Sequence, residues 1–107
     1  MPVAPAASSS FNAEQALRLG RETVRTEAEA LHAMGERLGG GFVQVVQRVL
    51  ATTGRVVVMG MGKSGHVGRK IAATLASTGT PAFFVHPAEA SHGDLGMVAG
   101  GDLVLAI

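Results

Sequence analysis

The chain has 107 residues, a net charge of +1 and no cysteine, which allows one small domain and excludes disulfides and thiolate metal sites. With 47 % hydrophobic and 16 % charged residues the composition is globular, and the missing cysteines fit a reducing cytoplasm. Because basic and acidic residues are interleaved and no apolar run approaches the ~20 residues of a membrane span, we expect neither nucleic acid nor membrane as a partner.

The N-terminal part is expected to be a disordered tail over residues 1–10, followed by a helical arm over residues 11–54. Asn12 is typical of a helix cap, and Gln15 three residues later would complete a capping box. We expect this helix to end at the glycines of residues 39–41, and a second helix to follow and to stop before Gly54. Apolar residues recur at roughly helical spacing in the first helix: Ala16, Leu17, Val24, Leu31, Met34 and Leu38.

The remaining part, residues 55–107, alternates strands with crossovers. Apolar runs predict strands over residues 56–59, 82–85 and 103–107, with a helix ending near Ser77 and a loop with a short helix near Ala88 between them. Crossovers of this length indicate an α/β fold with a parallel sheet. Because the chain ends inside the third strand, we expect an incomplete, Rossmann-like parallel-sheet domain, truncated from a longer one.

The turn over residues 60–65, Gly-Met-Gly-Lys-Ser-Gly, lies between the first strand and a helix. Glycine lets ligand atoms approach the backbone, and free N–H groups at a helix start favour an anion. Lys63 adds a positive charge and Ser64 a hydroxyl donor. This pattern predicts a site for phosphate or another oxyanion, with Gly62 and Ser64 as binding residues.

Known motifs with similar spacing fit this turn less well. The glycines at 60, 62 and 65 match the dinucleotide fingerprint. That fingerprint also requires an acidic residue at the end of the next strand, where this chain has His86. A P-loop would need a glycine where Val57 lies inside the strand. A strand-to-helix turn with glycines for steric reasons alone stays open as an alternative.

A longer run of sequence resembles a known family. GKSGH, then STGTP, then HPAEASHGDLG resemble the sugar isomerase (SIS) domain of bacterial D-arabinose 5-phosphate isomerases, the KpsF/GutQ family, from about Val56 to Ile107. The preceding helices resemble that family's N-terminal arm. The resemblance implies an enzyme that interconverts D-ribulose 5-phosphate and D-arabinose 5-phosphate for Kdo and lipopolysaccharide synthesis, and a homo-oligomer, a tetramer in the family, whose arm packs on a partner subunit.

The resemblance also implies roles for individual residues. Lys63 matches an active-site lysine, with a role in stabilising the charge of the enediolate or of the phosphate. Gly79 and Thr80 match a substrate-contacting pair, although Gly79 also fits a helix cap before Pro81. His92 matches a residue beside the substrate. His86 matches a position associated with metal, which we expect to hold inhibitory or adventitious zinc, since no cofactor is required.

Two histidines keep less specific interpretations. His66 either touches substrate or caps backbone groups, and His32 is expected to be solvated or at an interface. The family's serine-rich second phosphate loop, its later acidic residues and histidine, and its C-terminal CBS domains are all missing from residues 1–107. We therefore expect part of a substrate site, inactive alone. The alternative is a non-catalytic phosphosugar-sensing module of the kind found in transcription regulators. Those regulators usually carry an N-terminal helix-turn-helix domain, and residues 1–54 show no basic recognition helix.

Overall fold

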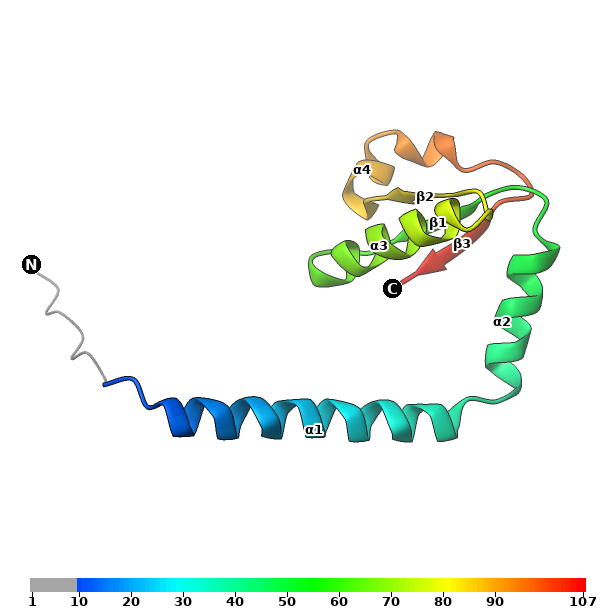
Figure 1. Cartoon of the computed structure of the whole chain (residues 1–107). Helices are drawn as coiled ribbons and strands as arrows, with labels where there is room; N and C mark the ends of the chain where they lie inside the picture. The colour runs from blue at the N-terminus through cyan, green and yellow to red at the C-terminus, as the bar shows by residue number, and fades with distance from the viewer. Residues whose placement is uncertain (1–9) are drawn as a thin grey trace, which may run out of the picture. The chain divides into compact units, whose positions relative to one another are not determined.

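The computed structural model describes residues 10–107. The predicted tail, residues 1–10, lies outside the described residues except for Ser10. Contacts between residues divide the chain into two units, Met1–Gly39 and Gly40–Ile107. The first contains helix α1 and the second contains a small parallel sheet with its helices (Figure 1). Among residues 10–107, no helix combines the length and the apolar character needed to cross a membrane.

Helix α1 spans Ala13–Arg37 and begins as the sequence predicts. The side chain of Asn12 accepts a hydrogen bond from the N–H of Gln15 at 3.0 Å, which satisfies one of the helix's unpaired first donors. The helix contains no buried residue. Leucine or valine recurs at every seventh position of its surface: Leu17, Val24, Leu31 and, just beyond the helix, Leu38.

The break after α1 is shorter than the sequence predicts. Helix α2 spans Gly40–Ala51, so two of the three glycines expected to end α1 already belong to α2. The chain leaves α1 at Leu38, whose backbone is extended and whose N–H donates to the Gly35 carbonyl at 3.2 Å. Gly40 and Gly41 lie at the start of α2, outside the helix interior where glycine is most costly.

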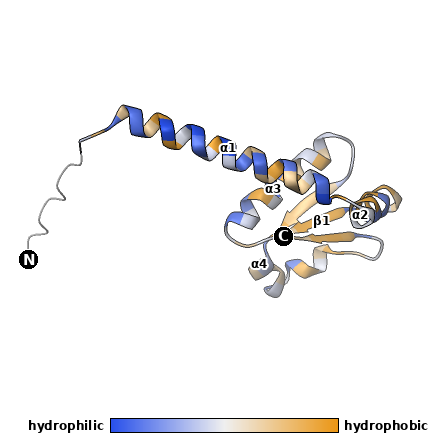
Figure 2. Ribbon diagram, turned by 90° about the horizontal axis from the view of Figure 1, so that it is seen from below, coloured by the Kyte–Doolittle hydropathy of each residue, from blue (hydrophilic) through white to orange (hydrophobic). Residues whose placement is uncertain are grey.

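The sheet has three parallel strands in the order β2-β1-β3. Strand β1 (Val56–Met59) is central, between β2 (Ala82–Val85) and β3 (Leu103–Ala106). Figure 2 shows the strands as the most hydrophobic part of this unit. Val56, Val57 and Val58 are at most 1 % exposed, which confirms the predicted strand buried on both faces and the predicted α/β class with a parallel sheet.

Helix α3 (Lys63–Ser77) packs on β1 and β2. Ala72 of α3 joins Val56 and Val58 in the core, and Val49 of α2 packs against the same cluster. Gly68 lies where α3 approaches the sheet most closely, since a Cβ atom there would be 3.1 Å from both Phe84 and Val58. Close helix–sheet packing therefore depends on a residue without a side chain.

The crossover segment, residues 86–101, connects β2 to β3. The predicted short helix near Ala88 is confirmed as α4 (Pro87–Ser91). A 3-10 helix, η1 (Asp94–Met97), follows it and was not anticipated from the sequence. Neither short helix contains a buried residue, and they contact each other.

Candidate functional site

The glycine-rich turn lies at the carboxyl edge of the sheet, directly after β1. It is shorter than the sequence predicts, because α3 begins at Lys63 and only residues 60–62 remain outside regular structure. Lys63 and Ser64 thus lie in the first turn of a helix. In open parallel sheets, ligands bind beyond the carboxyl ends of the strands, so the position of the turn fits the predicted oxyanion site.

Gly62 has a backbone conformation that favours glycine. Its φ is 59° and its ψ is −127°, and a Cβ atom there would have no neighbour within 4 Å. The position is therefore open in space but strained for any residue with a side chain. The backbone of Gly62 bends there from the turn into α3.

The first donors of α3 point away from the helix without a partner. The carbonyls of Met61 and Gly62 accept from Gly65 and His66, at 3.3 and 3.2 Å. Among the hydrogen bonds of residues 10–107, none uses the backbone N–H of Lys63 or Ser64. The N-cap residue is Gly62, which has no side chain that could accept from them. Two free N–H groups at the positive end of a 15-residue helix can bind an anion.

The side chains around these donors are accessible. Lys63 and His66 are exposed and Ser64 is half-buried. The Lys63 ammonium can add a full charge to the two backbone donors, and the Ser64 hydroxyl can add one more hydrogen bond. The imidazole of His66 caps no backbone group in the described part of the chain, and its contact with a ligand stays a prediction.

His86 follows β2 at the same edge, because Val85 pairs with Met59 in the parallel register. It caps α4: its Nδ1 accepts a hydrogen bond from the N–H of Ala88 at 3.1 Å. A neutral imidazole whose Nδ1 accepts carries its proton on Nε2. His86 therefore presents an N–H donor from its free nitrogen.

His92 ends α4 and is exposed, as are Glu89 and Asp94. The crossover segment thus carries an exposed imidazole and two exposed carboxylates after His86. Within residues 10–107, however, no three His, Asp or Glu side chains come together in a way that could hold a metal ion.

Gly79 and Thr80 lie at the opposite edge of the sheet, just before β2 begins. Gly79, with a φ of 100°, ends α3 in a Schellman motif. The N–H of Thr80 donates to the Leu75 carbonyl at 2.9 Å, and that of Gly79 to the Ala76 carbonyl at 3.4 Å. Strand β2 separates this pair by a strand length, on the order of 13 Å, from His86, which lies at the same edge of the sheet as Lys63. Within a single chain, Gly79 and Thr80 are therefore not brought to Lys63.

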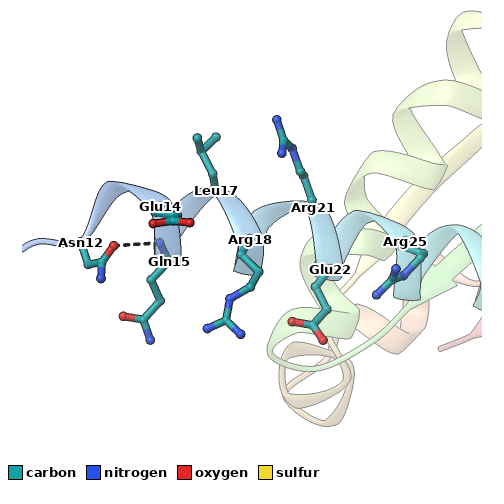
Figure 3. Close-up of a pocket in the computed structure, with 8 residues that line it drawn as sticks. All are labelled: Asn12, Glu14, Gln15, Leu17, Arg18, Arg21, Glu22 and Arg25. Atoms are coloured by element: carbon teal, nitrogen blue, oxygen red, sulfur yellow. Dashed lines mark hydrogen bonds between the residues drawn. The ribbon is translucent and has the colours of Figure 1, made fainter.

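Two hollows of the described residues lie elsewhere, along α1. Figure 3 shows one of them, lined by charged side chains such as Arg18, Glu22 and Arg25, all from a single helix. Walls from one helix do not enclose a ligand, so we do not assign the site there.

Comparison with known proteins identifies related sequences and structures. The family model for the SIS domain matches residues 49–107. The chain is 61 % identical over 87 residues to Arabinose 5-phosphate isomerase KdsD of Pseudomonas aeruginosa, covering 81 % of this chain and 27 % of that protein. It is 57 % identical over 94 residues to Arabinose 5-phosphate isomerase GutQ of Escherichia coli K12, covering 88 % and 29 %. The chain therefore spans less than a third of the length of these relatives.

A solved structure with the same fold is that of an Escherichia coli CFT073 protein in complex with A5P. The TM-score is 0.84 at 42 % identity, and the match covers 90 % of this chain and 51 % of that one. The fold of most of this chain is thus found in a structure that holds this ligand.

Proposed function

Because the chain belongs to the SIS domain family, we propose that it supplies part of the substrate site of an arabinose 5-phosphate isomerase, which interconverts D-ribulose 5-phosphate and D-arabinose 5-phosphate. Two features support the proposal together. One is the similarity to arabinose 5-phosphate isomerases over most of the chain. The other, which carries it, is the pair of unpartnered N–H groups at Lys63 and Ser64, at the carboxyl edge of the sheet.

Lys63 has two chemical uses in such a reaction. Aldose–ketose isomerisation moves a proton between neighbouring carbons and leaves negative charge on the oxygens of an enediolate. An ammonium group held near that charge, or near the phosphate, stabilises it electrostatically. A cation at the positive end of a helix is unfavourable unless an anion lies beside it, so the position of Lys63 favours a role with a bound anion.

The histidines and the Gly79–Thr80 pair take supporting roles in this proposal. His86 would donate from Nε2 to a sugar or phosphate oxygen, and His92 would contact the sugar from the crossover segment. Gly79 and Thr80, at the other edge of the sheet, would contact the phosphosugar of a neighbouring subunit rather than that of their own chain. No cofactor is required for these roles.

The residues present do not fit a zinc centre. Zinc usually takes three or four protein ligands, and no such group exists among residues 10–107. Zinc at Nε2 of His86 would move the proton to Nδ1, which could then no longer accept from Ala88. Any zinc binding is therefore proposed to be adventitious or inhibitory. It would break the hydrogen bond by which His86 caps α4.

The parent protein is proposed to be a cytoplasmic homo-oligomer, a tetramer as the resemblance implies. The apolar residues on α1, such as Leu17, Val24 and Leu31, are all exposed, and burying them against the same helix of another subunit would remove apolar surface from water. The product would serve Kdo and lipopolysaccharide synthesis. The 107-residue chain itself would bind the phosphosugar weakly and not turn it over.

Titration of the 107-residue chain with arabinose 5-phosphate, followed by NMR, tests the proposal. We expect the amide signals of Gly62, Lys63 and Ser64 to shift in a saturable way, while NAD causes no shift. A chimera in which this chain replaces the matching 94 residues of E. coli GutQ should isomerise the sugar. Absence of both the shifts and the chimera's activity would refute the proposal.

A further inference from the structure

The start of β1 and the end of the crossover segment are joined through one carboxylate, that of Asp102. One oxygen accepts from the backbone N–H of Arg55 at 2.7 Å, and the other from that of Ala99 at 2.8 Å. Arg55 also donates to this carboxylate from its side chain at 3.4 Å. The Asp102 side chain is only 3 % exposed, so these bonds are shielded from competing water.

The side chain of Arg55 extends the connection further. Its guanidinium donates to the carbonyl of Met97, the last residue of η1, at 2.7 Å. It also lies over the ring of Phe83 in β2, 4.5 Å from the ring centroid. Arg55 therefore links the crossover segment to two neighbouring strands.

The backbone at Gly54 leaves room for the carboxylate of Asp102. A Cβ atom at Gly54 would lie 2.5 Å from Oδ1 of Asp102 and 2.7 Å from the carbonyl of Gly101, so a side chain at Gly54 would displace the carboxylate. The Gly54 N–H also donates to the Gly101 carbonyl at 3.2 Å. The approach of these two segments thus requires glycine at position 54.

Little else holds the crossover segment. Neither α4 nor η1 buries a residue, so apolar packing contributes little to its position. Its first end is fixed where His86 caps α4, and its second end at Arg55 and Asp102. His92, at the end of α4, lies between these two attachments along the chain.

We infer that Arg55 and Asp102 are positioning residues, which hold the crossover segment so that His92 can contact the sugar of the bound phosphosugar. Neither residue touches the ligand of its own chain, since both lie at the amino edge of the sheet. The inference takes the identity of the ligand from the proposed function. Its structural part, that the pair restrains the crossover segment, is independent of the proposed function.

The test compares Arg55→Met with the unmodified 107-residue chain by amide hydrogen exchange and by titration. We expect exchange of the His92 and Gly93 amides, which donate to carbonyls of α4, to accelerate about tenfold in the variant. The Ile107 amide, bonded to Met59, should change less than about twofold. Arabinose 5-phosphate should bind about tenfold more weakly.

Inorganic phosphate separates positioning from general loosening of the fold. Phosphate needs only the donors at Lys63 and Ser64, so it should bind Arg55→Met as it binds the unmodified chain, whereas the sugar phosphate should not. The matched control is Arg69→Met, which removes an arginine that lies 4.3 Å from the Phe84 ring, as Arg55 lies over the Phe83 ring. Asp102→Asn, which keeps the side-chain shape, gives a second variant if Arg55→Met unfolds.

Each result decides something. Unchanged exchange of His92 and Gly93 in a folded variant would overturn the inference, as would equal affinity for arabinose 5-phosphate. Weaker binding of phosphate and sugar phosphate alike would also overturn it, because the effect would then be general. If the unmodified chain binds neither ligand and the GutQ chimera is inactive, the proposed function fails, while the exchange comparison still decides whether the pair restrains the segment.

Discussion

Gly60 and Gly65 are in direct backbone contact where β1 passes into α3. A Cβ atom at Gly65 would lie 2.8 Å from the carbonyl oxygen of Gly60, and one at Gly60 would lie 2.8 Å from the carbonyl carbon of Ser64. This contact holds the first turn of α3 against the end of the strand. It thereby determines where the free donors of Lys63 and Ser64 point.

We predict that Gly65→Ala destabilises the sheet unit by about 1–3 kcal/mol, because a methyl group there must displace backbone atoms. Chemical denaturation followed by circular dichroism measures this free energy of unfolding. Gly20→Ala in α1 is the control, since a Cβ atom there has no neighbour within 4 Å, and it should raise helicity. Equal stability of Gly65→Ala and the unmodified chain would contradict the close contact.

Lys63→Ala is expected to weaken binding of arabinose 5-phosphate by about tenfold or more, the effect of losing a charged hydrogen-bond donor. The free energy of unfolding should hardly change, because Lys63 is exposed. Isothermal titration calorimetry measures the affinity. Lys70→Ala, an exposed lysine later in the same helix, should bind normally, and equal losses in both variants would argue against a specific role.

The carboxylate of Asp102 should make stability depend on acid pH. Hydrogen bonds from the N–H groups of Ala99 and Arg55 hold the pKa of Asp102 below its ordinary value of 3.8. A lowered pKa in the folded state stabilises the fold above the ordinary value, and this stabilisation is lost as pH falls through the lowered pKa.

We therefore expect the difference in unfolding free energy between the unmodified chain and Asp102→Asn to be largest near neutral pH and to shrink below about pH 4. Urea denaturation at several pH values checks this. Asp94→Asn, at an exposed carboxyl in η1, provides the comparison. A difference that stays constant from neutral to strongly acid pH would show that the charge of Asp102 does not matter.

Metal removal should leave ligand binding unchanged. Because the Nδ1 of His86 is engaged by Ala88 and no metal-binding cluster exists among the described residues, chelation with EDTA should not alter the affinity for arabinose 5-phosphate. Adding zinc should instead perturb the amide signal of Ala88. Loss of sugar phosphate binding on chelation, restored by zinc, would refute this prediction.

Self-association through α1 is expected for the 107-residue chain. Val24→Asp together with Leu31→Asp places charges among exposed apolar side chains and should reduce the assembly to monomers in analytical ultracentrifugation. Glu22→Lys with Glu29→Lys changes charge on the same helix without touching the apolar residues, and should leave the mass unchanged. Identical masses for the aspartate variant and the unmodified chain would exclude this interface.

Local patterns in the sequence determined most of the fold. The uninterrupted apolar run Val56–Met59 predicts a central strand because only a strand covered on both faces keeps every side chain from water. Asn12 predicts the start of α1 because its cap is formed with a residue only three positions away. The glycine-rich motif likewise predicts an anion site, since its donors come from consecutive residues.

Relations between distant residues were decided only by the tertiary structure. Arg55 and Asp102 lie 47 positions apart, and nothing in either segment alone shows that they meet; parallel pairing of β1 with β3 brings them together. Parallel pairing of β1 with β2 separates Thr80 from Lys63, although both belong to one sequence resemblance. Parallel strands place their amino ends at one edge of the sheet and their carboxyl ends at the other, so which residues share a site depends on the edge they reach rather than on the motif they belong to.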